Sequence, residues 1–210
     1  MGFDEAMYKV ARRLADVTDR MMKKHHNRVK HEDDLTGYLF GAIDERMTDM
    51  VADGIRWDAS VLTHRTGGEE GKYGADILLH VSLDTPQQTY SKGVLIQAKR
   101  IGPNKNMRTK DHDDLIDQCE KMLQVSSASW VFAYDGKGMR AAPATKISGA
   151  AERNLYDQCD WTGYRFYREL FRCPVGDPKI TTADVAALDV RFSVDIRGKG
   201  SLEKTGVIKG

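Results

Sequence analysis

The sequence predicts an α/β protein with a mixed β-sheet, helices on the faces of that sheet and an N-terminal helical segment. Apolar residues recur at three- and four-residue steps through most of the first fifty positions, and alternate with polar ones from about residue 55. Further along, a helical pattern lies between two strand patterns, and such a crossover places a helix on one face of the sheet. The chain has 210 residues, 40% of them hydrophobic, which is enough to bury the core of one domain.

The N-terminal part has the pattern of two amphipathic helices. The first is predicted from about residue 4 to residue 30, and the second from near His31 to about Asp53, just before Gly54. We expect each helix to pack its apolar stripe against a sheet. The residues of these stripes are Met7, Val10, Leu14 and Val17, then Leu35, Leu39 and Met47.

Three strands are predicted next. Ile55–Thr63 alternates apolar and polar residues, and it is followed by strand patterns at Asp76–Leu83 and Gly93–Arg100. The connection between the last two is short enough for a hairpin. Because the three strands follow one another without a helix, the sequence predicts an antiparallel meander.

The C-terminal half adds helices and further strands. A helix over Asp113–Gln124 joins the third strand to an apolar strand over Ser129–Tyr134, which makes a crossover unit. The remaining predictions are two helices and an edge strand, at Tyr164–Arg172, Thr181–Leu188 and Phe192–Ile196. We expect one domain over 1–210, with N-terminal helices at 4–53, a core at 55–135, a C-terminal extension at 136–196 and a loose tail at 197–210.

The chain as a whole carries almost no net charge, since 32 Lys and Arg residues against 31 Asp and Glu residues give +1. Any site for a polyanion must therefore be local. No apolar run approaches the roughly 20 residues of a membrane helix and no signal segment opens the chain, so we expect a cytoplasmic protein with no membrane partner. The three cysteines fit neither a disulfide framework nor a zinc site, and we expect them to be reduced and mostly buried.

A local basic stretch runs from Lys99 to Lys110, with five basic residues and no acid. Loops of this kind contact phosphates, although a solvated surface is the commoner explanation for any single residue. The acidic run that follows suits the first turns of a helix. The candidate nucleic-acid-binding residues are Arg100, Lys105, Arg108 and Lys110.

Polar residues interrupt the predicted hairpin where strands are normally apolar. Because side chains alternate with a period of two, Gln97 and Lys99 project from one face of their strand, and Asp76 opens the partner strand beside them. A carboxylate and an amide oxygen can share a hard cation such as Mg²⁺, and a lysine beside them can orient a water or offset negative charge in a phosphorane-like transition state. Taken singly, Asp76 fits a turn or capping residue, and Gln97 or Lys99 fits edge-strand polarity.

This pattern resembles that of a known family. Gly74-Ala75-Asp76 followed by Gln97-Ala98-Lys99 is similar to the signature of the PD-(D/E)XK nuclease superfamily, which has the restriction-endonuclease-like fold. Gln97 stands where the family pattern has an acidic residue. Members with glutamine at that place occur in the superfamily, but the change lowers the charge of the site and weakens the expected metal affinity.

The resemblance extends to two helices and covers about residues 30 to 135. His31–Thr36 resembles the helix that supplies a further carboxylate in the family, which points to Glu32, with Asp33 as the alternative. The helix that holds Asp117-Gln118-Cys119 resembles the family helix after the catalytic strand. Glu69 and Glu70 are alternative ligands, although they fit solvated loop residues better.

The resemblance implies a metal-dependent endonuclease that hydrolyses DNA phosphodiester bonds, in a setting such as restriction or anti-phage defence. It implies Mg²⁺ as the cofactor, with Mn²⁺ as a substitute, and a homodimer where both strands are cut. A chain this short has little room for both a catalytic domain and a dedicated sequence-reading module, so we expect specificity to come from an oligomer, a partner or an activating ligand. The implied catalytic residues are Asp76, Gln97, Lys99 and Glu32, of which Asp76, Gln97 and Glu32 are the implied metal ligands.

Two alternative functions stay open. The first is a catalytically weak or inactive binding module with a nuclease fold that holds nucleic acid or a partner, because Gln97 replaces an acid. The second is a nuclease directed at RNA. The aromatic run at 164–171 has helical spacing, so we expect it in the core or in a subunit interface rather than on a base-stacking surface.

Overall fold

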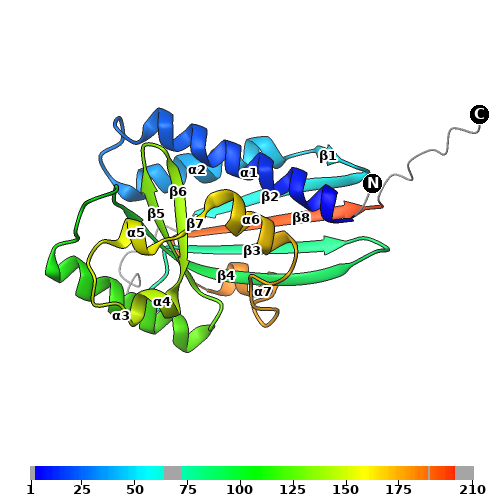
Figure 1. Ribbon diagram of the computed structural model, residues 1–210. Coiled ribbons are helices and arrows are strands. Elements are labelled where there is room, and N and C mark those ends of the chain that lie inside the picture. Colours follow the sequence, from blue (N-terminus) through cyan, green and yellow to red (C-terminus); the bar gives the residue numbers. More distant parts are fainter. Residues whose placement is uncertain (1–2, 64–71, 189, 202–210) are drawn as a thin grey trace, which may run out of the picture.

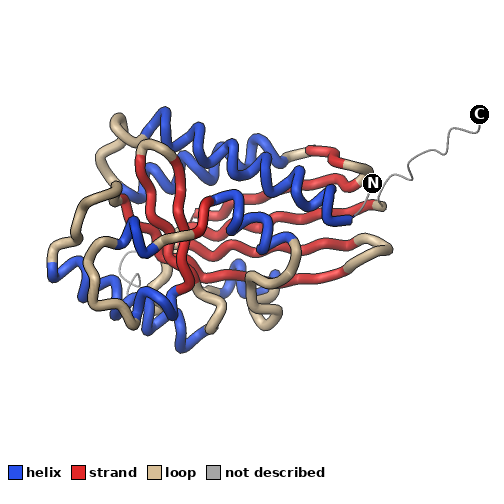
Figure 2. Tube along the Cα trace, viewed as in Figure 1, coloured by secondary structure: helices blue, strands red, loops and turns tan. Residues whose placement is uncertain are grey.

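The protein is described here by a computed structural model over residues 3–63, 72–188 and 190–201. One mixed sheet of eight strands runs through it, and helices cover both faces (Figure 1, Figure 2). The expected α/β class is confirmed. The strands are β1 (Met50–Ala52), β2 (Ile55–Thr63), β3 (Ile77–Asp84), β4 (Thr89–Arg100), β5 (Trp130–Asp135), β6 (Gly138–Pro143), β7 (Trp161–Thr162) and β8 (Phe192–Gly200), in the spatial order β1-β2-β8-β3-β4-β5-β6-β7.

Seven helices of the described residues form two groups. They are α1 (Phe3–His25), α2 (Glu32–Met47), α3 (Thr109–Val125), α4 (Ala144–Ser148), α5 (Leu155–Gln158), α6 (Gly163–Phe171) and α7 (Thr182–Ala187). The buried residues of α1, α2 and α6 form a core with one face of the sheet, and those of α3, α4, α5 and α7 form a core with the other. Figure 1 shows α1 and α2 above the strands and α3 and α4 below them.

Side-chain alternation along β4 decides which residues reach which face. Val94 and Ile96 belong to the core beneath α1 and α2, whereas Leu95 belongs to the core beneath α3. With a period of two, Gln97 and Lys99 continue the row of Leu95 on the α3 side. The sheet therefore places both polar residues on one face, as the sequence predicts.

The predicted hairpin and crossover are both present. Strands β3 and β4 pair antiparallel with Ile77 opposite Ile96, and β4 pairs parallel with β5 with Ile96 opposite Trp130. Helix α3 makes the connection between β4 and β5. The parallel pair is what positions α3 over the end of β4.

The predictions for the last strand are wrong. Strand β8 is not an edge strand but lies between β2 and β3, antiparallel to the first and parallel to the second. It separates β2 from β3, so the three consecutive strands do not form a meander. The predicted tail begins inside this strand, because β8 continues to Gly200, and residues 202–210 lie outside the described residues.

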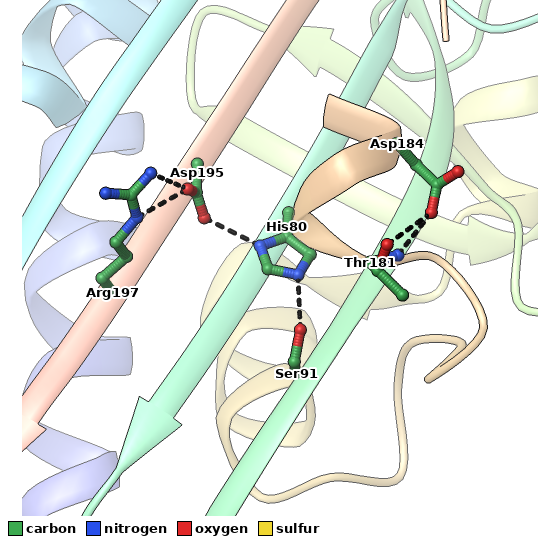
Figure 3. Close-up of polar contacts among 6 residues, drawn as sticks. All are labelled: His80, Ser91, Thr181, Asp184, Asp195 and Arg197. Carbon is green, nitrogen blue, oxygen red and sulfur yellow. Dashed lines mark hydrogen bonds and ion pairs between the residues drawn. The ribbon is translucent and has the colours of Figure 1, made fainter. Parts of the chain in front are cut away.

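A long-range polar contact explains this difference. The polar side of β8 carries Ser193 and Asp195, which indicates solvent exposure in the sequence, but both are buried. Asp195 accepts a hydrogen bond from His80 on β3, with 2.7 Å between Oδ1 and Nδ1 (Figure 3). A buried carboxylate needs such a partner, and the partner lies 115 positions away in the sequence.

Both N-terminal helices are shorter than predicted. Helix α1 ends at His25 instead of residue 30, and α2 ends at Met47 instead of Asp53. After α2 the chain forms the short hairpin of β1 and β2, which turns through Asp53 (φ 53°) and Gly54 (φ 83°). Two positive φ values in a two-residue Asp-Gly loop are the signature of a type I′ turn, so Gly54 turns a hairpin rather than ending a helix.

The expectation that the aromatic run lies in the core is confirmed. Phe166, Tyr167 and Phe171 of the aromatic run are buried in the core beneath α1 and α6. The cysteines form no disulfide in the described residues, where Cys119 and Cys159 are buried and Cys173 is partly exposed. No helix in the part of the chain that the structure describes has the length and hydrophobicity to cross a membrane.

Candidate active site

The polar residues of the predicted site gather where β4 ends and β3 begins. The start of α2 reaches this point from one side and α3 from the other, and the loop at 101–108 leaves from it (Figure 1). A pocket of about 800 Å³ opens here. It is lined by His26, Asn27, Glu32, Lys99, Arg100, Ile101, Gly102, Lys105, Asn106, Met107, Arg108, Asp111, Asp114 and Gln118.

Asp76 and Gln97 are held together by the hairpin. The backbone N–H of Asp76 donates to the carbonyl of Ile96 over 3.0 Å, which places Asp76 beside Gln97 on the neighbouring strand. The Gln97 side chain donates from Nε2 to Oδ2 of Asp76, and the N–H of Ala98 donates to the same oxygen over 3.1 Å. These bonds fix the orientation of the Asp76 carboxylate.

Lys99 and Glu32 complete the group. Lys99 Nζ lies 3.8 Å from Oε1 of Glu32, the first residue of α2. The other carboxylate oxygen of Glu32 accepts a hydrogen bond from the backbone N–H of Arg100. The structure thus brings all four predicted catalytic residues to one end of the sheet, from α2, β4 and the residue before β3. We call Glu32, Asp76, Gln97 and Lys99 the site cluster.

Asp33, the alternative ligand on α2, has a different partner from Glu32. Asp33 forms an ion pair with Arg191 and lines a different pocket from Glu32. Glu69 and Glu70 lie outside the described residues. Of the two neighbouring acids at the start of α2, Glu32 is therefore the one that contacts Lys99.

Two carboxylates in the site cluster are held at a high pKa. Burial raises the pKa of Glu32 to about 7, against the opposing effect of the Lys99 ammonium, and the Asp76 charge adds to the rise. Burial also raises the pKa of Asp76 to about 6, although Lys99 and the N–H of Ala98 lower it. The Lys99 ammonium does not offset the effect of burial on these two partly buried carboxylates, so the cluster favours a further positive charge.

Two amide oxygens at the site lack a hydrogen-bond partner. Oε1 of Gln97 and Oε1 of Gln118 are both buried without a partner among the residues that the structure describes, whereas buried polar atoms in proteins are nearly always paired. The described residues contain no cluster of three or more His, Cys, Asp or Glu side chains that could hold a metal ion. The donors present are instead two carboxylates and the Gln97 amide oxygen, which fit a hard cation that keeps several waters.

The structure explains why a glycine stands at position 74, two residues before Asp76. Gly74 has a φ of +69°, and a Cβ there would come within 2.2 Å of the backbone oxygen of Gln118 on α3. Only glycine combines this φ with so close an approach. Gly74 therefore lets α3 pack directly on the segment that carries Asp76.

The predicted nucleic-acid-binding residues differ in their surroundings. The Arg100 guanidinium donates to the carbonyls of Val29, over 2.6 Å, and of His26, so it holds the connection between α1 and α2. Arg108 forms two hydrogen bonds with Asp111, at 2.7 and 2.9 Å. Lys105 lies exposed at the pocket, and Lys110 is exposed on α3 but is not among the residues that line the pocket.

The sequence prediction assigned no role to the α3 residues of the pocket. Asp111, Asp114 and Gln118 are spaced by three and four positions, which places them on one face of α3. That spacing was visible in the sequence, but the acidic residues also fit a solvated helix start. What identifies this face is that it lines the same pocket as Lys99, which depends on the crossover from β4.

Comparisons with protein-family models, with curated proteins and with solved structures found no match. The geometry of the site cluster is therefore the basis on which a function can be inferred.

Proposed function

We propose that this chain is a Mg²⁺-dependent endonuclease with a restriction-endonuclease-like fold, and that it hydrolyses DNA phosphodiester bonds. The observation that carries the proposal is the site cluster, in which two partly buried carboxylates, a buried amide oxygen without a partner among the described residues and a lysine meet beside a pocket. This is the combination expected of a PD-(D/E)XK nuclease in which glutamine replaces one acid.

Glu32, Asp76 and Gln97 would hold the metal ion through oxygen atoms. When bound, the ion supplies Lewis-acid stabilisation of charge on the phosphate. Lys99 orients the attacking water, and its ammonium offsets the negative charge that develops on the phosphorus oxygens. The hydrogen bond from the N–H of Ala98 and that from Gln97 keep the Asp76 carboxylate in place.

Plasmid cleavage tests this function. We expect the purified protein to nick supercoiled DNA with Mg²⁺ or Mn²⁺ and not with a chelator, and Lys99→Ala to abolish nicking. Lys199→Ala is the matched control, because Lys199 lies near the end of β8, opposite Asp84 at the far end of β3 from Asp76, and is exposed. Equal nicking by wild-type protein and Lys99→Ala would refute the assignment of the site.

A catalytically weak binding module is the second candidate. The observation in its favour is that Asp76 Oδ2 already accepts two hydrogen bonds, one of them from the glutamine that replaces an acid. Gln97→Glu separates the two: in an enzyme it retains or raises metal-dependent nicking, and in a binding module it leaves nicking absent. A parallel digestion of single-stranded RNA decides whether the nuclease is directed at RNA instead.

Double-strand cleavage would require two sites, and each chain contributes one site cluster. We therefore expect a homodimer if linear plasmid appears together with nicked plasmid. Light scattering after size-exclusion chromatography measures the oligomeric state. A monomer that produces only nicked circles would be consistent with the proposed chemistry and would contradict the expected homodimer.

A further inference from the structure

A second pocket lies on the other side of the connection between α1 and α2, and the proposed chemistry does not use it. Its volume is about 1210 Å³, and its walls come from the end of α1, the connection, most of the length of α2, and Thr63, Arg191 and Phe192. We call it the stacking pocket, because of the feature described next.

An aromatic stack with an exposed end stands in this pocket. The rings of His25 on α1 and Tyr38 on α2 are stacked, with centroids 4.8 Å apart and planes 11° from parallel. Tyr38 is nevertheless 52% exposed, and among the large hydrophobic side chains exposed in the described residues it is the one aromatic. A ring held flat by a neighbour and open to solvent is the platform on which an unpaired base stacks.

Positive charge borders the stack. Lys24, Arg28 and Lys30 are exposed and line the stacking pocket. Asp33, Asp34 and Glu45 also line it, but Asp33 is paired with Arg191. Slight burial and the charges of Lys24 and Arg28 lower the pKa of His25, so its ring is neutral at pH 7 and serves as a stacking partner rather than as a cation.

The stacking pocket and the candidate active site share one wall. Neighbouring residues at each end of the connection line the two pockets alternately. At the end of α1, His25 lines the stacking pocket and the next residue, His26, lines the active-site pocket; at the start of α2, Glu32 lines the active-site pocket and Asp33 the stacking pocket. A polynucleotide strand that crosses this connection would therefore reach both pockets.

We propose that the stacking pocket binds an unpaired nucleotide next to the phosphodiester bond that is cut, with its base on Tyr38 and its phosphate beside Lys24, Arg28 and Lys30. The inference rests on the proposed nuclease function and narrows the substrate to DNA with a single-stranded segment. In a continuous duplex each base is stacked on its neighbours and has no face left for Tyr38. An unpaired base, in contrast, has a free ring face that can stack on Tyr38.

Binding of single-stranded DNA tests the proposal without cleavage. Fluorescence anisotropy with a labelled oligothymidylate in chelator measures the affinity of the full chain. We expect Tyr38→Ala to weaken binding at least about fivefold, the loss of one stacked base, and Tyr38→Phe to bind like the wild type. We also expect Arg28→Gln to weaken binding and to lower its dependence on salt.

Two controls make the result specific. Val51→Ala removes an exposed apolar side chain from β1, outside both pockets, and should bind like the wild type. A blunt duplex without unpaired bases should bind more weakly than the oligothymidylate and show no dependence on Tyr38. An unchanged thermal midpoint of Tyr38→Ala shows that the variant is folded.

The outcomes separate this inference from the proposed function. Equal binding by wild-type protein and Tyr38→Ala, or no measurable binding of the oligothymidylate, overturns the stacking site even if the protein nicks plasmid. Conversely, Tyr38-dependent binding together with an absence of metal-dependent cleavage of both the plasmid and the oligothymidylate retains the stacking site as a single-strand-binding surface and refutes the nuclease.

Discussion

Two polar clusters share one face of the β3–β4 hairpin, and they differ in how well their atoms are paired. The site cluster lies at the start of β3. The second, which we call the His80 cluster, consists of His80 on β3, Ser91 on β4, and Asp195 and Arg197 on β8 (Figure 3). His80 contacts Asp195 Oδ1 at 2.7 Å and Ser91 Oγ at 2.9 Å, and Arg197 Nε donates to Asp195 Oδ2 over 2.7 Å.

The His80 cluster is satisfied within the chain. Both ring nitrogens of His80 and both oxygens of Asp195 have partners, and although burial raises the pKa of Asp195, the bonds from His80 and Arg197 hold it below its ordinary value. The site cluster has the opposite character, with two carboxylates of raised pKa and an unpaired amide oxygen. The His80 cluster therefore joins three strands, and the site cluster has capacity left for a ligand.

The order Asp195, His80, Ser91 is also that of a hydrolase triad, but its setting differs. Ser91 lies inside the continuous strand β4, opposite Ser82 of β3. The nucleophile of an α/β-hydrolase stands on a sharp turn between a strand and a helix, where its hydroxyl is exposed to the substrate. The contacts of Ser91 therefore favour a structural role, in which the cluster fixes β8 between β2 and β3.

The largest expected effect is the loss of cleavage on changing the site cluster. Asp76→Asn should lower the rate of plasmid nicking between a hundred- and a thousandfold, about 3–4 kcal/mol in activation free energy, because it removes a charged ligand from the reacting centre. The same change should leave the free energy of unfolding in chelator unchanged or higher, since a buried charge is removed. A loss of stability large enough to account for the lost activity would show that Asp76 stabilises the fold, and would contradict its assignment as a ligand-binding residue.

The matching change in the His80 cluster should have the reverse outcome. Asp195→Ala leaves the buried His80 without its acceptor, and we expect the free energy of unfolding in urea to fall by about 2–3 kcal/mol. Ser91→Ala is the control: Ser91 is exposed, so water can replace its hydroxyl, and the loss should stay below about 1 kcal/mol. Folded Asp195→Ala should still nick plasmid, and a selective loss of cleavage would assign this cluster to catalysis.

The stability of the metal-free protein should depend on pH through the site cluster. The folded pKa of Asp76 is about 6 against 3.8, and that of Glu32 about 7 against 4.5. Because the folded state holds these protons more tightly, the stability contribution of the two groups falls as pH rises from about 4 to about 7. We expect a decrease of several kcal/mol, at most about 6 kcal/mol if the two groups titrate independently, measured by urea unfolding in chelator.

A double variant isolates this contribution from all other titrating groups. Glu32→Gln combined with Asp76→Asn should remove the decrease, and Mg²⁺ should restore the stability of the wild-type protein above pH 7, where both carboxylates are ionised. Parallel curves of stability against pH for the wild type and the double variant would show that folding does not raise the pKa of the two carboxylates.

The comparison also explains which parts of the molecule the sequence predicts. The site cluster comes from local patterns: alternation along β4 places Gln97 and Lys99 on one face, and the hairpin brings Asp76 beside them. Glu32 was predicted only through the resemblance to a nuclease family. Its contact with Lys99 depends on the position of α2 relative to β4, which no local pattern contains.

The central position of β8 shows where local patterns fail. Its alternation of Phe192, Val194 and Ile196 with polar residues is typical of an edge or surface strand, and nothing near it in the sequence shows that His80 will satisfy Asp195. Strand β6 was missed for a different reason. Its sequence Gly138–Pro143 contains two alanines and no β-branched residue, so its strand conformation comes from pairing with β5 rather than from propensity.

The smallest expected effect concerns the basic loop beside the site cluster, where Lys105 and Arg108 differ in pairing as the two clusters do. Arg108 is held by Asp111 through two hydrogen bonds, whereas Lys105 lies exposed at the pocket. If the loop contacts the DNA backbone, Lys105→Gln should lower the slope of log affinity against log salt by about one, the release of one counterion. Arg108→Gln should lower the slope less, because Asp111 already neutralises its charge. Titrations of DNA binding at several salt concentrations in chelator measure both slopes, and a larger effect for Arg108 would mean that DNA displaces Asp111 from the guanidinium.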